Sequence, residues 1–299
     1  MGKADAMPTA VTAPNSNRGS VRAAMTEWDT DRLDLDAYLA RIGHSGDLTP
    51  SASTLTALHR AHLTAVPFEN LDIVLGRGVA VDFDSVQDKL VNRRRGGYCY
   101  EHGVLFAAVL ERLGYAVDRL LARVGDDEKR PRPRSHMTLR VRAGTEQWLA
   151  DVGFGNGLLE PLPWDDTGAA HQQGGWTCQL VSPGGDSWQL RERQGQKWTV
   201  LYRFTEEPQH ASDVIVANHF TSTHASSRFV GQVVAMRKDA DAVRRLLDRH
   251  LTTARPDGSS DERVLTDTEI ADALADDFGV PLSRGEVGEV IATLPPPER

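Results

Sequence analysis

Three polar residues in the middle of the chain have the types and the order of a nucleophile, a base and an orienting acid. Cys99, His136 and Asp151 follow one another at separations of 37 and 15 residues. In such a set the thiol attacks, the imidazole moves the proton, and the carboxylate fixes the orientation of the imidazole. The sequence therefore predicts one triad and nucleophilic catalysis.

Cys99 stands where a thiol is readily activated. It follows Arg95-Gly96-Gly97-Tyr98 and opens a segment, from about Tyr100 to Leu113, whose apolar period predicts a helix. The N–H groups and partial positive charge of a helix N-terminus lower the pKa of a thiol and can stabilise an oxyanion. The alternative is that Cys99 is a small buried hydrophobic residue.

The other two residues fall on neighbouring predicted strands. Alternation places His136, Thr138 and Arg140 on one face of a strand. Asp151 ends the next strand within an apolar run, where a buried carboxylate needs a partner. Taken singly, the histidine and the aspartate are ordinary strand or turn residues. Their combination with Cys99 favours the triad.

The elements that must position these residues change in character along the chain. Helical periodicity predicts a small bundle up to residue 113, including a helix that Thr49-Pro50 opens. From Tyr115 the period changes to two, and six predicted strands separated by Gly- and Pro-rich turns suggest an antiparallel barrel or sandwich. Beyond about residue 212 the patterns mix. Phe229–Met236 is strand-like, and a helix capped at Thr266 or Asp267 runs through Phe278.

Composition excludes several classes of function. The 34 Lys and Arg against 42 Asp and Glu give a net charge of −8, which argues against a nucleic-acid binder. No apolar run is long enough for a membrane span, and the first residues lack the apolar stretch of a secretory signal, so neither is expected. With only Cys99 and Cys178 there is no disulfide framework, so a cytoplasmic location is expected. Residues 1–26, which lack Leu, Ile and Phe, predict a disordered tail.

Other uses of these residue types fit less well. The sequence has no CxxC pair or HxxxH cluster, so no metal site is expected. It has no Walker loop, and Gly153-Phe154-Gly155 lacks the spacing of a dinucleotide fingerprint. A basic loop can touch a polyanionic cofactor, although a solvated loop is the favoured interpretation. That loop contains Lys129, Arg130, Arg132 and Arg134.

The segment Arg94–His102 resembles the active-site motif of the arylamine N-acetyltransferases. Three more segments follow the family order: Val66–Asn70, His136-Met137 and Asp151–Gly155. A further segment, Ala217–His224 followed by Ser227-Arg228-Phe229, resembles the C-terminal part of bacterial members. The resemblance covers roughly residues 27–294.

One position departs from the family pattern. Members commonly have Asn directly after the Glu-His or Glu-Gln pair of the motif, and this chain has Gly103 there. We expect looser helix packing or altered polar contacts behind Cys99, with the triad retained.

The resemblance implies an α+β fold in three parts around a cysteine-protease-like catalytic core. Residues 27–113 would form a helical bundle that carries the nucleophile. Residues 114–212 would form an antiparallel β-barrel that carries the histidine and the aspartate, and residues 213–299 an α/β lid. Residues 1–26 remain outside as the tail.

The resemblance also implies roles for individual residues. Cys99, His136 and Asp151 would be the catalytic triad. Phe68 and Phe154 would line the pocket where the acetyl group meets its acceptor. Gly155 would let the pantetheine arm of the donor pass close to the backbone, and Arg95 with Glu69 would form a structural ion pair.

The implied reaction is a ping-pong acetyl transfer from acetyl-CoA, through an acetyl-cysteine, to the nitrogen of arylamines, arylhydrazines or N-hydroxyarylamines, as in xenobiotic metabolism. The thiolate of Cys99, paired with the imidazolium of His136, would attack the thioester. The partners expected are CoA and a small aromatic amine or hydrazine, with no metal, nucleic acid or membrane. A homodimer is left open.

Three alternatives compete with this interpretation. An amide synthase of the same fold would release a polyketide by forming an aromatic amide, and acceptance of acetyl-CoA would distinguish the two. A transglutaminase-like or protease-like hydrolase would act on peptide amides and ignore acetyl-CoA. A binding module for small aromatic molecules would not depend on the thiol.

Overall fold

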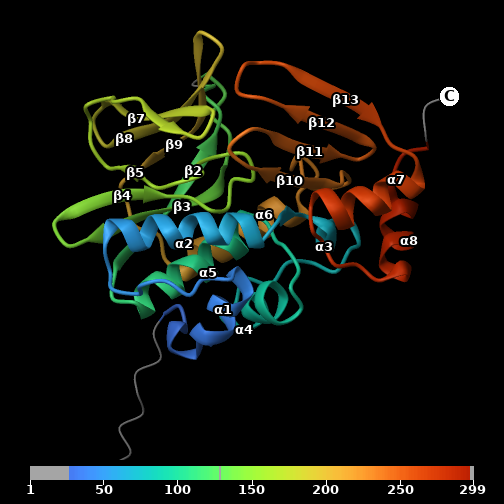
Figure 1. Cartoon of the computed structure of the whole chain (residues 1–299), viewed down its shortest axis with the longest axis horizontal. Helices are drawn as coiled ribbons and strands as arrows, with labels where there is room; N and C mark the ends of the chain where they lie inside the picture. Colours follow the sequence, from blue (N-terminus) through green and yellow to red (C-terminus); the bar gives the residue numbers. More distant parts are fainter. Residues whose placement is uncertain (1–26, 128, 297–299) are drawn as a thin grey trace, which may run out of the picture.

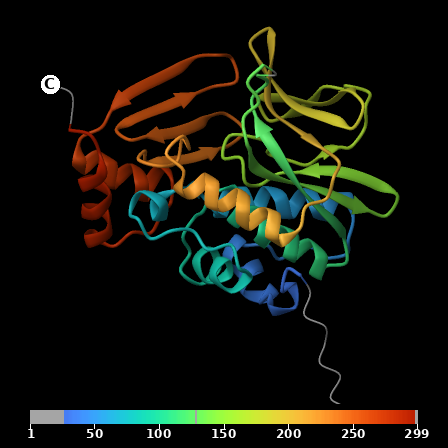
Figure 2. The same ribbon diagram turned by 180° about the vertical axis from the view of Figure 1, so that it is seen from behind.

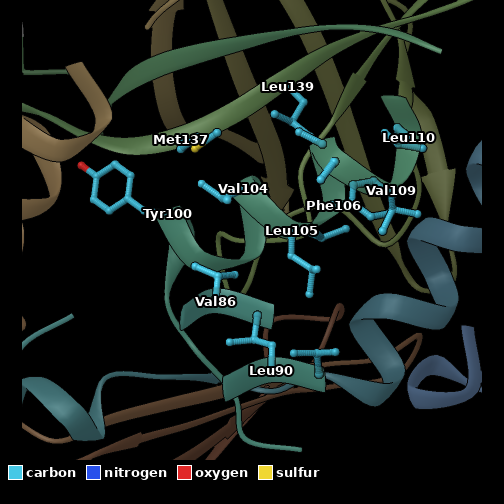
Figure 3. Packing of buried hydrophobic residues seen from close by; sticks show 14 of the residues in the cluster. Val86, Leu90, Tyr100, Val104, Leu105, Phe106, Val109, Leu110, Met137 and Leu139 are labelled. Carbon is cyan, nitrogen blue, oxygen red and sulfur yellow. The ribbon is translucent and has the colours of Figure 1, made fainter. Parts of the chain in front are cut away.

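The helix that begins at Cys99 lies at the centre of the fold. The computed structural model describes residues 27–127 and 129–296, so the tail predicted for residues 1–26 lies outside the described residues. Helix α5 spans Cys99–Arg112, and every residue in it up to Leu110 is buried. Figure 3 shows its apolar side chains between Val86 and Leu90 on one side and Met137 and Leu139 on the other. A helix buried all round must be covered on several sides.

Further helices pack around α5 in the first third of the chain, as predicted. They are α1 (Leu35–Ile42), α2 (Ala52–Ala65), α3 (Leu71–Val74) and α4 (Phe83–Gln87), with a 3-10 turn at Thr30–Arg32 and a π-helical turn at Asp88–Asn92. The predicted start of α2 was wrong. Its N-cap is Ser51, whose side chain accepts from Thr54 N, whereas the Thr49 hydroxyl donates to Asp47.

The six predicted strands are confirmed, and two short ones join them in an eight-stranded antiparallel sheet that is nearly closed into a barrel. The sheet order is β5-β4-β3-β2-β9-β8-β7-β6. The strands are β2 (Ala116–Val124), β3 (Arg134–Ala143), β4 (Glu146–Ala150), β5 (Leu162–Pro163), β6 (His171–Gln173), β7 (Trp176–Gly184), β8 (Ser187–Gln194) and β9 (Lys197–Thr205). Figure 1 shows this sheet over α2 and α5, with a second sheet beside it.

The second sheet combines one strand from the helical first third of the chain with four strands from its last third. Its order is β1-β10-β11-β12-β13. The strands are β1 (Phe68–Glu69), β10 (Val234–Lys238), β11 (Val243–Leu247), β12 (His250–Ala254) and β13 (Ser260–Val264). The strand predicted at Phe229–Met236 begins only at Val234. The Asn70 side chain donates to Phe229 O and Gln232 O, and these bonds hold the preceding residues in turns.

Three helices complete the fold: α6 (Ala211–Thr223), α7 (Asp267–Asp272) and α8 (Arg284–Thr293). Thr266 caps α7 as predicted, and a π-helical turn at Ala273–Asp277 continues it to Gly279, which has φ +67°. Figure 2 shows α6 on the side that faces away in Figure 1. There the Tyr100 hydroxyl of α5 lies 3.2 Å from the Thr221 hydroxyl of α6.

Candidate active site

The turn before α5 lies so close to the chain around β1 that a side chain would not fit between them. Gly97 N donates to Pro67 O at 3.2 Å. A Cβ on Gly96 would lie only 2.2 Å from that same oxygen, so the approach needs glycine. A parallel bridge pairs Phe68 with Gly97. The sequence motif therefore brings Phe68 next to the turn that presents Cys99.

A buried network of ion pairs fixes the same turn. Arg95 Nη2 lies 2.8 Å from Glu69 Oε1 and 3.6 Å from Asp72 Oδ1. Lys89 Nζ lies 2.8 Å from Glu101 Oε1 and 2.7 Å from Asp72 Oδ2. Charges removed from water need such partners. The structure thus pairs Arg95 with Glu69, and it adds three charged residues that sequence reasoning missed.

His136 of β3 and Asp151, directly after β4, meet in the interior of the protein. His136 Nε2 lies 2.7 Å from Asp151 Oδ2, and both side chains are buried. A carboxylate can only accept, so the neutral imidazole carries its hydrogen on Nε2. Its Nδ1 is then able to take up a proton, which is the property that a base activating a thiol requires.

Asp151 is held by more partners than the sequence predicts. The Tyr202 hydroxyl donates to Asp151 Oδ2 at 2.6 Å, and Gly153 N donates to Oδ1 at 3.0 Å. The backbone N–H of Asp151 donates to His59 Nε2 at 3.1 Å. Burial by itself raises the pKa of Asp151, but the charge of His136 and the hydrogen bonds to the carboxylate outweigh it, and the pKa lies below its usual value. Asp151 is therefore an anion at neutral pH.

The Cys99 thiol is buried and donates to the Ser135 carbonyl at 3.7 Å. Burial is the largest influence and raises the pKa of Cys99, whereas backbone N–H groups lower it by less. The expectation of a lowered thiol pKa was therefore wrong in its sign, because burial of the thiol outweighs the effect of the helix N-terminus. Activation then requires that the thiol proton move to a base as the sulfur attacks.

Cys99 and His136 line one cavity of about 580 Å³. It lies where the barrel, the second sheet and the residues after α6 meet. Phe68 and Phe154 also line it, and the Phe154 ring lies edge-on to the His136 ring with centroids 4.9 Å apart. The remaining lining residues are Val124, Gly125, Arg132, Pro133, Ser135, Gly153, Asn156, Val200, Leu201, Phe220, Thr221, Ser226, Ser227, Arg228, Phe229, Met236 and Arg245.

Gly155 is placed differently from the other predicted pocket residues. It is not among the described residues that line the cavity. Its φ is +82°, and a Cβ there would lie 3.0 Å from both Met236 Sδ and Phe68 Cγ. Glycine is therefore required at this position by the backbone conformation and by close packing.

A chain of buried polar groups lies behind Cys99, and sequence reasoning missed it. His102 Nε2 lies 3.1 Å from Gly97 O, His62 Nε2 lies 2.9 Å from His102 Nδ1, and the Tyr38 hydroxyl lies 2.9 Å from His62 Nδ1. The Gly97 carbonyl accepts, so His102 and His62 each carry hydrogen on Nε2, and Tyr38 donates. Burial lowers the pKa of His102 to about 4 and that of His62 well below its usual value. Both rings are therefore neutral.

The packing at Gly103 is tight, which is opposite to the looser packing expected from the sequence. A Cβ on Gly103 would lie 2.8 Å from Met137 Sδ and 3.0 Å from Met137 Cγ. The methionine of β3 occupies the space that a side chain on α5 would need. Gly103 therefore lets β3, which carries His136, lie close to α5.

Within residues 27–127 and 129–296, no group of three or more His, Cys, Asp or Glu side chains is arranged to hold a metal ion. In the same residues, no helix is long and apolar enough to cross a membrane.

Comparison with known proteins identifies the family. A family model described as N-acetyltransferase matches residues 51–287. An arylamine N-acetyltransferase of Mycolicibacterium smegmatis is 36% identical over 275 residues, which cover 87% of this chain and 99% of that protein. The chain belongs to the arylamine N-acetyltransferase family. The resemblance read from the motifs is thereby confirmed.

Solved structures of the family have the same fold. The arylamine N-acetyltransferase of Nocardia farcinica is 40% identical, with a TM-score of 0.83 over 88% of this chain and 95% of that one. The Mycobacterium marinum arylamine N-acetyltransferase in complex with CoA is 34% identical, with a TM-score of 0.80 over 87% of this chain and 100% of that one.

Proposed function

We propose that this member of the family transfers an acetyl group from acetyl-CoA to the nitrogen of arylamines, arylhydrazines or N-hydroxyarylamines. The observation that carries the proposal is the 2.7 Å bond from His136 Nε2 to Asp151 Oδ2 beside a cavity that Cys99 also lines. Relatives named arylamine N-acetyltransferases, one of them solved with CoA, support this choice of donor and acceptor.

The first half of the reaction forms an acetyl-cysteine. Cys99 Sγ attacks the thioester carbonyl carbon while its proton passes to His136 Nδ1, and the Asp151 anion stabilises the imidazolium. The carbon–sulfur bond to CoA breaks, and the CoA thiolate takes the proton from His136. Burial raises the pKa of the Cys99 thiol, so the reaction needs His136 as the group that takes up its proton.

The second half regenerates the thiol. The amine nitrogen attacks the acetyl carbon, His136 accepts the proton that the nitrogen loses, and the bond to Cys99 Sγ breaks. The proton then returns to the sulfur. Phe68 and Phe154 give the cavity aromatic walls that suit an aromatic acceptor. Contact of the pantetheine arm with Gly155 remains a prediction, and supporting roles for Arg95 and Glu69 belong to the same proposal.

The proposal assigns a separate role to each of three segments of the chain. Residues 27–113 form the helical part that carries the nucleophile, residues 114–212 the barrel that carries the base and the acid, and residues 213–299 a lid. The core is of the cysteine-protease-like kind. The placement of Cys99 at the start of α5, with His136 on β3 and Asp151 directly after the adjacent strand β4, supports this division. We propose a cytoplasmic enzyme that acts on small aromatic substrates without a metal.

The test is release of free CoA from acetyl-CoA, with and without 4-anisidine, by wild type, Cys99→Ala and Cys178→Ala. Cys178 is the other cysteine, and it is buried in the barrel. We expect amine-dependent release that Cys99→Ala lowers at least about 10³-fold and that Cys178→Ala leaves unchanged. After incubation with acetyl-CoA, mass spectrometry should find one added acetyl group in wild type and in Cys178→Ala, and none in Cys99→Ala. Activity that persists in Cys99→Ala would refute the assignment of the nucleophile.

A further inference from the structure

Three arginines from separate parts of the chain converge on the cavity that Cys99 lines. Arg132 lies in the loop between β2 and β3, Arg228 follows α6, and Arg245 is on β11. More than 110 residues separate the first from the last in the sequence. No Asp or Glu is among the described residues that line this cavity.

Within the described part of the chain, these guanidinium groups have no protein partner. Arg245 Nε is fully buried and makes no hydrogen bond. Its neighbour Arg244 is different, since Arg244 Nη1 contacts Asp239 Oδ2 at 2.8 Å on the other face of the strand. A buried donor without an acceptor is energetically unfavourable, so a site that retains one, as at Arg245 Nε, usually has an acceptor in its working state.

The three positive charges also act on one another. Arg228 is exposed overall, but partial burial of its guanidinium group lowers the pKa of Arg228, and the charges of Arg132 and Arg245 lower it further. The folded chain, with a net charge of −8, thus concentrates unbalanced positive charge at this one place. Such a local field attracts and orients an anion whatever the overall charge of the protein.

We propose that Arg132, Arg228 and Arg245 bind the phosphate groups of the acyl donor. The proposal rests on the proposed function and extends it to the nucleotide end of acetyl-CoA. Guanidinium groups are planar forks that bind phosphate oxygens with two donors each, and three of them match a group that carries several negative charges. A carboxylate on the acceptor would supply only one charge. The pantetheine arm of the donor would then extend along the cavity from the arginines and place the thioester near Cys99 and His136.

The experiment compares two acetyl donors that share the reacting group and differ in phosphate. Acetyl-CoA has phosphates, and p-nitrophenyl acetate has none. The enzymes are wild type, Arg228→Gln, Arg245→Gln and the double variant, with 4-anisidine as a neutral acceptor. Arg244→Gln is the matched control, because it removes a guanidinium from the same strand that already has a partner.

We expect each single substitution to raise KM for acetyl-CoA about tenfold, and the double variant to raise it further. The kcat/KM for p-nitrophenyl acetate should stay within about twofold of wild type, since no phosphate is involved. Free CoA should inhibit the reaction with p-nitrophenyl acetate in wild type and much less in the double variant. Arg244→Gln should behave as wild type in every assay.

Three results would overturn the inference while leaving the acetyltransferase proposal intact. The first is an unchanged KM for acetyl-CoA in the double variant. The second is an equal loss with both donors, which would assign the arginines to the fold or to the reacting groups. The third is a loss seen only when 4-aminobenzoate replaces 4-anisidine, which would assign them to the acceptor. A wild type that uses neither donor would instead refute the proposed function.

Discussion

Tyr202 donates its hydroxyl hydrogen to the same Asp151 oxygen that accepts from His136, at 2.6 Å. The three side chains come from β9, from the residue after β4, and from β3. The rings of Tyr202 and His136 also pack together, with centroids 4.8 Å apart. Tyr202 is therefore a positioning residue, because it holds the carboxylate that orients the base.

Replacing Tyr202 with Phe should lower kcat/KM about tenfold while KM for the amine changes little. The ring contacts with His136 remain, but the carboxylate loses a donor and becomes freer to turn away from Nε2. Loss of a hydrogen bond from a buried network should lower the free energy of unfolding by about 1–2 kcal/mol. Steady-state kinetics and urea unfolding measure the two effects.

Tyr115→Phe is the matched control for this substitution. The Tyr115 hydroxyl also bonds inside the protein, donating to Ser51 O at 2.8 Å, but it does so away from the triad. Loss of this hydrogen bond should lower the free energy of unfolding by a similar amount and leave kcat unchanged. If both variants reduced activity in proportion to their loss of stability, Tyr202 would have a structural role only.

The triad itself could be predicted from the sequence because its members stand at recognisable positions. A glycine-rich turn marks Cys99, a period of two marks the strand of His136, and an apolar run isolates Asp151. Local patterns of this kind also give the element types and most of their bounds. The family motifs add the partnership between distant segments that periodicity alone cannot supply.

The contacts that the sequence could not predict are those between residues far apart in the chain. Tyr202 alternates inward, but its partner 51 residues away is fixed only when the barrel closes. Arg228 and Arg245 look like ordinary surface charges until α6 and β11 bring them to one cavity. The pKa of Cys99 was predicted with the wrong sign because helix position is visible in a sequence and burial is not.

Substitutions at Gly103 and Met137 should have strongly coupled effects on the free energy of unfolding. In the wild-type background Gly103→Ala should lower the free energy of unfolding by about 1–3 kcal/mol, because its Cβ would meet Met137 Sδ at 2.8 Å. Met137→Ala alone should cost about 2–5 kcal/mol by leaving a cavity. In that second background Gly103→Ala should be neutral or stabilising, since alanine favours a helix over glycine by about 1 kcal/mol. Urea unfolding of the four proteins gives the coupling energy.

A glycine on an exposed helix face provides the comparison for this set of four proteins. Nothing lies within 4 Å of a Cβ placed on Gly285 of α8. Gly285→Ala should therefore stabilise the protein by about 0.5–1 kcal/mol in both backgrounds. A coupling energy near zero between positions 103 and 137 would show that the methionine moves aside without cost.

The buried histidines should make the fold sensitive to acid. Burial lowers the pKa of His102 to about 4, against an ordinary value of 6.5 in the unfolded chain. Between these two values the unfolded chain binds a proton that the folded chain does not. The stability that the neutral ring contributes is therefore complete above about pH 6.5 and is lost as the pH falls toward 4. His62, whose pKa is also lowered by burial, acts in the same direction.

His102→Gln tests this linkage, because glutamine can accept from His62 and donate to Gly97 O but does not titrate. Between pH 4.5 and 6, the slope of the unfolding free energy against pH should fall by up to about 1.4 kcal/mol per pH unit, the value for one proton. His250→Gln is the control, since the exposed His250 side chain meets water in both states. Urea unfolding at several pH values measures the slopes. Equal slopes in wild type and His102→Gln would mean that His102 takes up its proton without unfolding.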